Sequence, residues 1–288
     1  MNNILYGKNI ADEIMKEVSE GVKSLRQLDK IPLLMTLEVG EDPASKVYVT
    51  SQRRSAEMVG VDFESIELAS GITQKRLLGV VQSINRDPFI SGVILQLPLP
   101  SHLDTRLIQW SIDSAKDVEG VTPYNLGRLF LGVPGLMPCT AQAIVAIIKS
   151  TGIDLAGKEV TVVGNSEIVG KPTSILLLEE KATVTVCHIA TYDRGYLEEH
   201  VRRAEILVVA VGKPELIKGE WIKEGAIVID AGINYVNNSA VGDVEFEAAQ
   251  KRAAYITPVP GGVGAVTVAY LMKNTVAAIN MQMAQKDS

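Results

Sequence analysis

The stretch Val160-Thr-Val-Val-Gly-Asn-Ser-Glu-Ile-Val-Gly-Lys-Pro172 decides the expected fold of this chain. A β-branched run leads into a glycine turn and a helix start, which predicts the strand-turn-helix of a nucleotide-binding fold. Gly164 permits the tight turn, Ser166 can cap the helix or donate to a phosphate, and Gly170 lets chain and ligand approach closely. The pattern is looser than the full dinucleotide fingerprint, so an ordinary strand-to-helix turn is the alternative interpretation.

Further apolar runs follow this stretch, separated by polar segments of helix length. Continuous apolar strands without alternation predict a parallel sheet covered on both faces, a doubly wound Rossmann-like architecture that binds ligands at the carboxyl ends of its strands. Gly212 and Gly232 come just after two of those ends, where a cofactor needs backbone contacts. The runs are Ala182–Cys187, Ala204–Val211 and Gly225–Asp230.

The first half of the chain shows the same alternation. We expect helices over 7–28, 43–59 and 73–85 and strands over 32–39, 61–68 and 91–97. Pro98 and Pro100 end the third strand and turn Gln96 towards the strand end.

Together the two halves predict an α/β protein of two α/β domains. The first domain covers 1–137, and the apolar C-terminal helix, 265–288, packs on it. The dinucleotide-binding domain covers 138–264. A helix over 140–151 links them, and the ligand cleft is expected between the two domains.

Composition limits the classes of function. The chain has 288 residues, a hydrophobic content of 47% and a net charge of −6, which suits two cores and argues against nonspecific binding of nucleic acid. Only Cys139 and Cys187 are present, so we expect a cytoplasmic protein without disulfides. No apolar run reaches membrane-spanning length, so no membrane partner is expected. The three histidines lack partners at a recognisable spacing, so no metal site is predicted.

Seven motifs occur in the order seen in methylenetetrahydrofolate dehydrogenase/cyclohydrolases, the FolD family, which this chain resembles along nearly its whole length. The resemblance implies oxidation of 5,10-methylenetetrahydrofolate to the methenyl form by a nicotinamide cofactor, commonly followed by hydrolysis to 10-formyltetrahydrofolate. It also implies a homodimer. The motifs are Ser45–Tyr48, Gly92–Leu99, Lys116–Gly120, Tyr124–Arg128, Pro138–Thr140, Gly164–Pro172 and Thr257–Gly264.

The resemblance also implies site residues. Tyr48 packs against the folate rings, Gln96 bonds near the reacting end, and the segment Pro260–Val263 brings backbone close to folate and nicotinamide. The catalytic candidates are Tyr48, Gln52, Gln96 and Glu119. The substrate-binding candidates are Tyr48, Gln96, Leu97, Glu119, Pro260, Gly261, Gly262 and Val263. The cofactor-binding candidates are Gly164, Asn165, Ser166, Ile168, Val169, Gly170, His188, Ile189, Val211, Gly212, Gly232, Ile233 and Thr267.

Two positions depart from the family pattern. Gln52 stands where the family has its catalytic lysine, four residues after Tyr48, and a carboxamide cannot take a proton from water. Glu119 replaces the usual aspartate of the folate site and moves the charge outward by one methylene. The sequence therefore predicts a dehydrogenase with weak or absent cyclohydrolase activity. A bifunctional enzyme and a noncatalytic folate- or nucleotide-binding partner protein are the alternatives.

The choice of cofactor depends on the residues after the first two strands of the second domain. Family members that use NADP carry cations there, whereas this chain has Asn165, Ile189 and Ala190. We therefore expect NAD. NADP is the alternative, because no acidic residue ends the second strand and because Lys171 or Arg194 is able to reach a phosphate.

Overall fold

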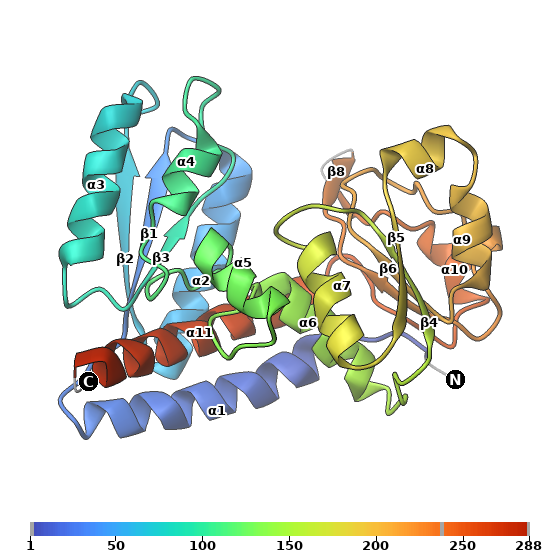
Figure 1. The fold of residues 1–288 in the computed structure, drawn as a ribbon, viewed down its shortest axis with the longest axis horizontal. Coiled ribbons are helices and arrows are strands. Elements are labelled where there is room, and N and C mark those ends of the chain that lie inside the picture. The colour runs from blue at the N-terminus through green and yellow to red at the C-terminus, as the bar shows by residue number, and fades with distance from the viewer. Residues whose placement is uncertain (1–2, 237–238, 287–288) are drawn as a thin grey trace. The chain divides into compact units, whose positions relative to one another are not determined.

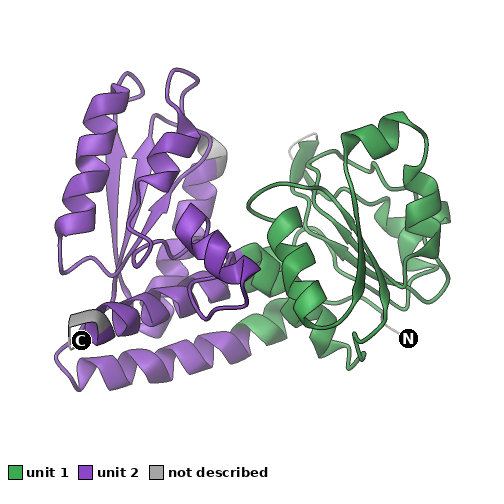
Figure 2. Ribbon diagram, viewed as in Figure 1, with its two compact units in different colours: residues 1–11, 140–267 green, residues 12–139, 268–288 purple. Residues whose placement is uncertain are grey.

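The computed structural model describes residues 3–236 and 239–286 and forms two compact units. Unit 1 comprises residues 1–11 and 140–267, and unit 2 comprises residues 12–139 and 268–288 (Figure 2). The first domain was expected to begin at residue 1, but residues 1–11 group with unit 1. The reason is that their backbone forms hydrogen bonds with unit 1. The Leu5 N–H donates to the Ile256 carbonyl at 2.8 Å, and the Gly7 N–H donates to the Gly261 carbonyl at 2.9 Å.

Unit 1 contains a five-stranded parallel sheet in the order β10-β7-β6-β4-β5 (Figure 1). The chain runs from β4 outward to β5 and then returns to β6 on the other side of β4, so the strand order reverses beside β4. This is the predicted doubly wound sheet, with its ligand crevice expected at that reversal. The strands are β4 (Glu159–Val163), β5 (Thr183–Cys187), β6 (Ile206–Val209), β7 (Ile227–Asp230) and β10 (Tyr255–Ile256).

Helices cover this sheet on both faces. Side chains of α9 and α10 pack with Val163, Leu207 and Val228 in one buried cluster, and α7 lies on the opposite side of the sheet (Figure 1). The edge strand β5 is only partly covered, and Val186 is 39% exposed. The remaining elements of unit 1 are α6 (Cys139–Ser150), α7 (Gly170–Glu179), α8 (Ile189–Asp193), α9 (Leu197–Arg203), η1 (Gly219–Trp221), β8 (Asn234–Val236), β9 (Ser239–Val241) and α10 (Phe246–Gln250).

Unit 2 contains a three-stranded parallel sheet in the order β2-β1-β3. Leu37 of β1 packs with Leu77 of α3 and Ile108 of α4 in the core on one face of the sheet. The helix α11 (Val263–Lys286) begins in unit 1 and continues into unit 2 from Val268. The other elements are α1 (Lys8–Arg26), which begins in unit 1 and continues into unit 2 from Asp12, and β1 (Leu33–Val39), α2 (Pro43–Val59), β2 (Asp62–Leu68), α3 (Gln74–Arg86), β3 (Gly92–Leu95), α4 (Thr105–Trp110) and α5 (Pro123–Phe130).

A turn held by Asp117 follows the sheet of unit 2. The Val93 N–H donates to the Lys116 carbonyl at 2.8 Å, so this segment lies along β3. The buried Asp117 carboxylate accepts from the Gly120 N–H at 3.0 Å, the Thr122 N–H at 2.7 Å and the Asn125 side-chain amide at 2.9 Å. Asp117 therefore has a structural role, because it fixes the turn that carries its neighbour Glu119.

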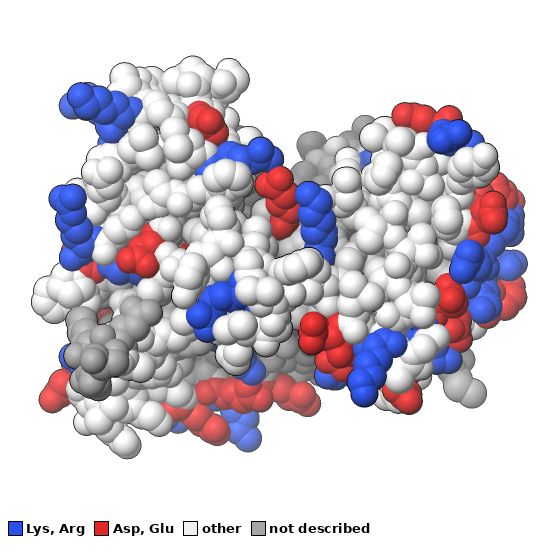
Figure 3. Space-filling view, in the orientation of Figure 1, with Lys and Arg blue, Asp and Glu red and all other residues white. Residues whose placement is uncertain are grey.

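The molecular surface carries both signs of charge. Figure 3 shows basic and acidic side chains interspersed on the visible face. Among the described residues, no helix is long and apolar enough to cross a membrane.

We expect Asp117→Asn to destabilise the protein by about 1–3 kcal/mol, because an amide cannot accept all three hydrogen bonds at a buried position. Urea unfolding followed by circular dichroism measures this change. Glu57→Gln, the same chemical change at an exposed position of α2, is the control and should alter the free energy of unfolding by less than about 0.5 kcal/mol. Equal stabilities of the two variants would contradict the structural role of Asp117.

Candidate functional site

The carboxyl end of the unit 2 sheet carries a cluster of polar side chains around Gln96. Its side-chain nitrogen donates to the hydroxyl of Thr36 in β1 at 2.9 Å and to the carbonyl oxygen of Gln52 at 3.0 Å. All three residues are buried, with at most 7% exposure. Both amide hydrogens of Gln96 are used within the protein, so its carbonyl oxygen is left as an acceptor. Sequence reasoning missed Thr36, because a buried threonine in a strand carries no motif.

Gln52 and Tyr48 lie one turn apart on α2, as their spacing predicts. Gln52 is fully buried, and its side-chain nitrogen has no partner at full hydrogen-bond geometry within the described residues, although its amide lies close enough to the Tyr48 hydroxyl to lower the pKa of that group. Tyr48 is 39% exposed. The pair thus offers a buried uncharged donor beside a partly open aromatic ring.

Glu119 completes this cluster. Its carboxyl group accepts from the Leu95 N–H, which places it beside the end of β3. Burial, with a smaller contribution from the negative charge of Asp117, raises the pKa of Glu119 to about 8. Burial and the nearby Glu119 also raise the pKa of Tyr48, which stays protonated at neutral pH. The structure therefore brings together all four predicted catalytic residues of unit 2.

The other folate-site candidates lie in two different parts of the chain. Leu97 follows Gln96 and is 39% exposed. The segment Pro260–Val263 lies in unit 1 and leads into α11. Gly261 has φ +102°, and a Cβ on Gly262 would lie 2.6 Å from the Pro258 carbonyl oxygen, so both positions require glycine.

Unit 1 has a pocket at the carboxyl ends of β4, β5 and β6, with a volume of about 320 Å³. Gly164 has φ +123°, and a Cβ there would lie 2.3 Å from the Ala210 carbonyl oxygen. The turn after β4 thus begins at a buried glycine and continues into the exposed residues Asn165 and Ser166, which line the pocket where a dinucleotide is expected. The pocket is lined by Val163, Gly164, Asn165, Ser166, His188, Ile189, Tyr192, Leu197, Ala210, Val211, Lys213 and Leu216.

Several cofactor candidates lie outside this lining. Ile168 and Val169 precede α7, Ile233 is 60% exposed, and Thr267 donates to the Val263 carbonyl within α11. Gly170 is the first residue of α7, six residues after Gly164, so Pro172 lies in the first turn of the helix as predicted. The Ser166 hydroxyl accepts from the N–H groups of Val169 at 3.1 Å and Gly170 at 3.3 Å, and so closes the turn that leads into α7.

Two buried aspartates hold the loops behind the pocket. Asp243 accepts from the N–H groups of Val211, Gly212 and Lys213 at 2.7, 2.9 and 2.9 Å. Asp230 accepts from the N–H groups of Gly232 at 2.9 Å and of Asp243 itself at 3.1 Å. The N–H groups of Gly212 and Gly232, which the sequence assigned to a cofactor, therefore bond to carboxylates of the protein.

This pair leaves no room for side chains on two neighbouring glycines. A Cβ on Gly232 would lie 2.1 Å from the Asp243 carboxyl carbon, and a Cβ on Gly242 would lie 2.0 Å from an Asp230 oxygen. Burial raises the pKa of Asp230 to about 6. Sequence reasoning missed both aspartates because they belong to no motif, and it missed Lys213 because it sought cofactor-selecting charges only after the first two strands.

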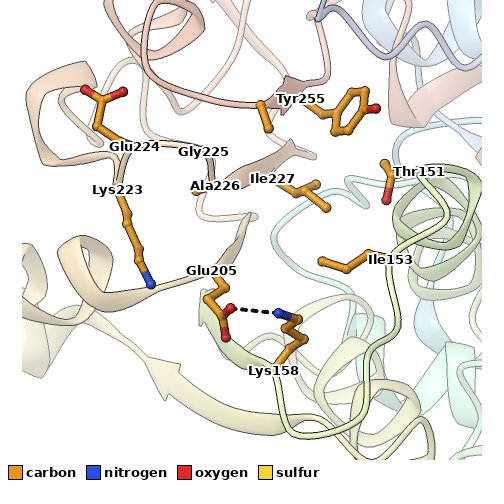
Figure 4. Close-up of a pocket in the computed structure, with 11 residues that line it drawn as sticks. Thr151, Ile153, Lys158, Glu205, Lys223, Glu224, Gly225, Ala226, Ile227 and Tyr255 are labelled. Atoms are coloured by element: carbon orange, nitrogen blue, oxygen red, sulfur yellow. Dashed lines mark hydrogen bonds and ion pairs between the residues drawn. The ribbon is translucent and has the colours of Figure 1, made fainter.

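A second pocket of unit 1, of about 330 Å³, lies at the opposite edge of the same sheet, by the amino ends of its strands (Figure 4). Lys158 and Glu205 form an ion pair of 2.9 Å there, and Lys223 extends its side chain along the same wall. None of its lining residues is a predicted site residue. Across residues 3–236 and 239–286, no group of three His, Cys, Asp or Glu side chains could hold a metal ion.

Comparison with known proteins identifies the two parts of the chain. The model of the tetrahydrofolate dehydrogenase/cyclohydrolase catalytic domain matches residues 5–119, and the model of the NAD(P)-binding domain of the same enzymes matches residues 138–283.

Individual relatives match over nearly their whole length. The protein from Acetivibrio thermocellus named Bifunctional protein FolD is 46% identical, covering 98% of this chain and 99% of the relative. The structure of the bifunctional enzyme FolD from Campylobacter jejuni has a TM-score of 0.93 at 40% identity, covering 97% of this chain and 99% of that one. A Trypanosoma brucei methylenetetrahydrofolate dehydrogenase-cyclohydrolase, complexed with NADP and an inhibitor, has a TM-score of 0.92 at 39% identity, covering 97% and 98%.

The fold and the pocket of unit 1 thus define a two-unit α/β protein with a dinucleotide-binding domain. Within that class, the chain belongs to the tetrahydrofolate dehydrogenase/cyclohydrolase family, which confirms the resemblance seen in its motifs.

The raised pKa of Glu119 leads to an expected dependence of stability on pH. The folded-state pKa of about 8 exceeds the ordinary value of 4.5, so the folded state binds the proton more tightly than the unfolded state. The free energy of unfolding should therefore fall as pH rises between these values, by up to about 1.4 kcal/mol per pH unit.

The measurement compares urea unfolding of the protein and of Glu119→Gln at pH 6 and pH 8. Asp230, with a pKa of about 6, still titrates at the start of this interval, but it does so in both proteins, so its contribution cancels in the comparison. The unmodified protein should lose about 2 kcal/mol more stability than the variant across this interval. Identical losses would show that Glu119 does not titrate there.

Proposed function

We propose that the chain oxidises 5,10-methylenetetrahydrofolate with a nicotinamide cofactor and hydrolyses the methenyl product, the two activities for which its relatives are named. The observation that carries this proposal is the cluster of Tyr48, Gln52, Gln96 and Glu119 at the carboxyl end of the unit 2 strands. We assign folate binding to unit 2 and dinucleotide binding to unit 1.

The oxidation step needs orientation more than acid or base catalysis. When bound, a nicotinamide cofactor would supply the acceptor for the hydride that leaves the carbon bridging two folate nitrogens. Those nitrogens stabilise the resulting cation with their lone pairs, so the protein need not supply a base. Gln96, fixed by Thr36 and Gln52, offers its carbonyl oxygen to the substrate, and Gln52 offers its unpaired N–H donor. Tyr48 supplies a ring against which folate packs.

The hydrolysis step needs a group that transfers protons, and Gln52 cannot do so. Glu119 is suited to it, because a carboxyl group with a pKa of about 8 exchanges its proton near neutral pH. As a water molecule attacks the methenyl carbon, the Glu119 carboxylate takes a proton from it. The protonated carboxyl group then returns that proton to the folate nitrogen when the carbon–nitrogen bond breaks, and the remaining hydroxyl proton of the intermediate leaves to solvent as the formyl carbonyl forms. Glu119 thereby replaces the missing lysine.

A second candidate is the dehydrogenase reaction alone. The uncharged amide of Gln52 favours it, because this fully buried position holds no titratable group. Under this candidate, methenyltetrahydrofolate is the released product.

For the cofactor we propose NADP ahead of NAD. The Trypanosoma brucei relative is complexed with NADP, and Lys213 supplies a positive charge at the pocket of unit 1. NAD, the cofactor expected from the sequence, becomes the second choice; the neutral residues Asn165 and Ile189 at the same pocket still favour it. The homodimer implied by the family is likewise a proposal, which sedimentation analysis tests.

We expect the unmodified protein to reduce NADP with methylenetetrahydrofolate and to consume methenyltetrahydrofolate faster than buffer does. An assay at two wavelengths follows both compounds together. Glu119→Gln should lower the rate of hydrolysis by about 10²-fold or more and affect hydride transfer less, because only hydrolysis needs the proton transfer. The double variant Gln52→Lys with Glu119→Asp, which restores the family pattern, should hydrolyse faster than Glu119→Gln.

Three outcomes separate the candidates. Hydride transfer without any enzyme-dependent loss of methenyltetrahydrofolate would establish the dehydrogenase reaction alone. Full hydrolysis by Glu119→Gln would remove Glu119 from the mechanism. Failure to reduce either NADP or NAD would overturn the proposed function.

A further inference from the structure

We propose that Lys213 recognises the 2′-phosphate of NADP and is therefore the residue that determines cofactor specificity. This inference rests on the proposed function, since it assumes that the pocket of unit 1 holds the adenosine part of a nicotinamide dinucleotide.

The side chain of Lys213 reaches the strand end where a 2′-phosphate is expected. Its backbone follows β6, the third strand of unit 1, and its ammonium nitrogen lies 4.7 Å from the ring centroid of Tyr192 in α8. The helix α8 follows β5, the second strand. In doubly wound folds, the ribose hydroxyls and the 2′-phosphate are bound beside the end of the second strand. Lys213 thus brings a charge from the third strand to that position.

Hydrogen bonds to the Asp243 carboxylate hold the backbone of Lys213 in place. The fully buried carboxylate of Asp243 accepts from three consecutive N–H groups, those of Val211, Gly212 and Lys213. Gly212, with φ +66°, allows the chain to turn around this carboxylate. The loop is therefore fixed before a ligand binds, which reduces the entropy lost on binding.

The other candidates for this contact do not supply a charge at the pocket. Asn165 and Ile189 line it but are neutral, and Lys213 is the one lysine or arginine among its lining residues, all of which belong to the described part of the chain. Arg194 instead lies over the ring of Tyr196, at 5.9 Å from its centroid. The cation–π contact of Lys213 with Tyr192 is weak at an exposed site, so the ammonium group can move onto a phosphate.

The test compares two probes that differ by the 2′-phosphate alone, 2′,5′-ADP and 5′-AMP, with binding to the full chain measured by titration calorimetry. Lys213→Met should weaken 2′,5′-ADP by about 10-fold or more, as expected for the loss of a charge-assisted hydrogen bond, and should leave 5′-AMP within about twofold. Lys213→Arg should retain most of the preference for 2′,5′-ADP.

Lys223→Met is the matched control, because Lys223 is an exposed lysine at the other pocket of the same unit. It should leave the affinities for both probes unchanged. Raising the salt concentration should reduce the difference in affinity between 2′,5′-ADP and 5′-AMP for the unmodified protein. The same change should have less effect on that difference for Lys213→Met.

The possible failures are distinguishable. If the unmodified protein binds NADP and Lys213→Met weakens both probes equally or neither, the assignment of Lys213 is overturned while the proposed function stands. If the unmodified protein binds neither NADP nor NAD, the proposed function fails and the inference fails with it.

Discussion

Buried carboxylates that accept bonds from several backbone N–H groups hold the functional loops of both units. Asp117 does this after β3, and Asp243 does it after β6. A carboxylate has about four acceptor sites, so one side chain satisfies donors that no strand or helix reaches. Removing such a charge would leave several buried N–H groups without partners, which is costly. The positions of Glu119 and Lys213 depend on these two aspartates.

The regular elements could be predicted from the sequence because burial imposes a pattern on them. Most strands of the two sheets are short apolar runs, although β2 carries Asp62, Glu64, Ser65 and Glu67. The long helices begin and end within a few residues of the expected positions. The short helices α4 and α5 were missed, because fewer than ten residues show too little periodicity. The loops held by Asp117 and Asp243 have no periodicity at all. Their geometry comes from contacts between residues distant in sequence, such as Asp243 with Val211.

The candidate site divides in the same way. Motif order located Tyr48, Gln96 and the turn at Gly164, since those positions match the family pattern. The effect of replacing lysine by Gln52 could not be foreseen from that position alone. The sequence suggested a loss of hydrolysis, whereas burial gives Glu119 a carboxyl group that titrates near neutral pH. Lys213 was overlooked because its charge reaches α8 from the loop after β6.

The two buried aspartates of unit 1 sterically restrict the glycines beside them. Gly232 lacks a side chain because the carboxyl group of Asp243 occupies that position, and Gly242 lacks one because of Asp230. A larger residue at either glycine would expel the opposing carboxylate, and a smaller residue at either aspartate would leave a cavity beside the glycine. A single substitution at any one of these two aspartates or two glycines is therefore disfavoured. The quartet should be inherited as a unit, even in lineages where the pocket itself has adapted to another nucleotide.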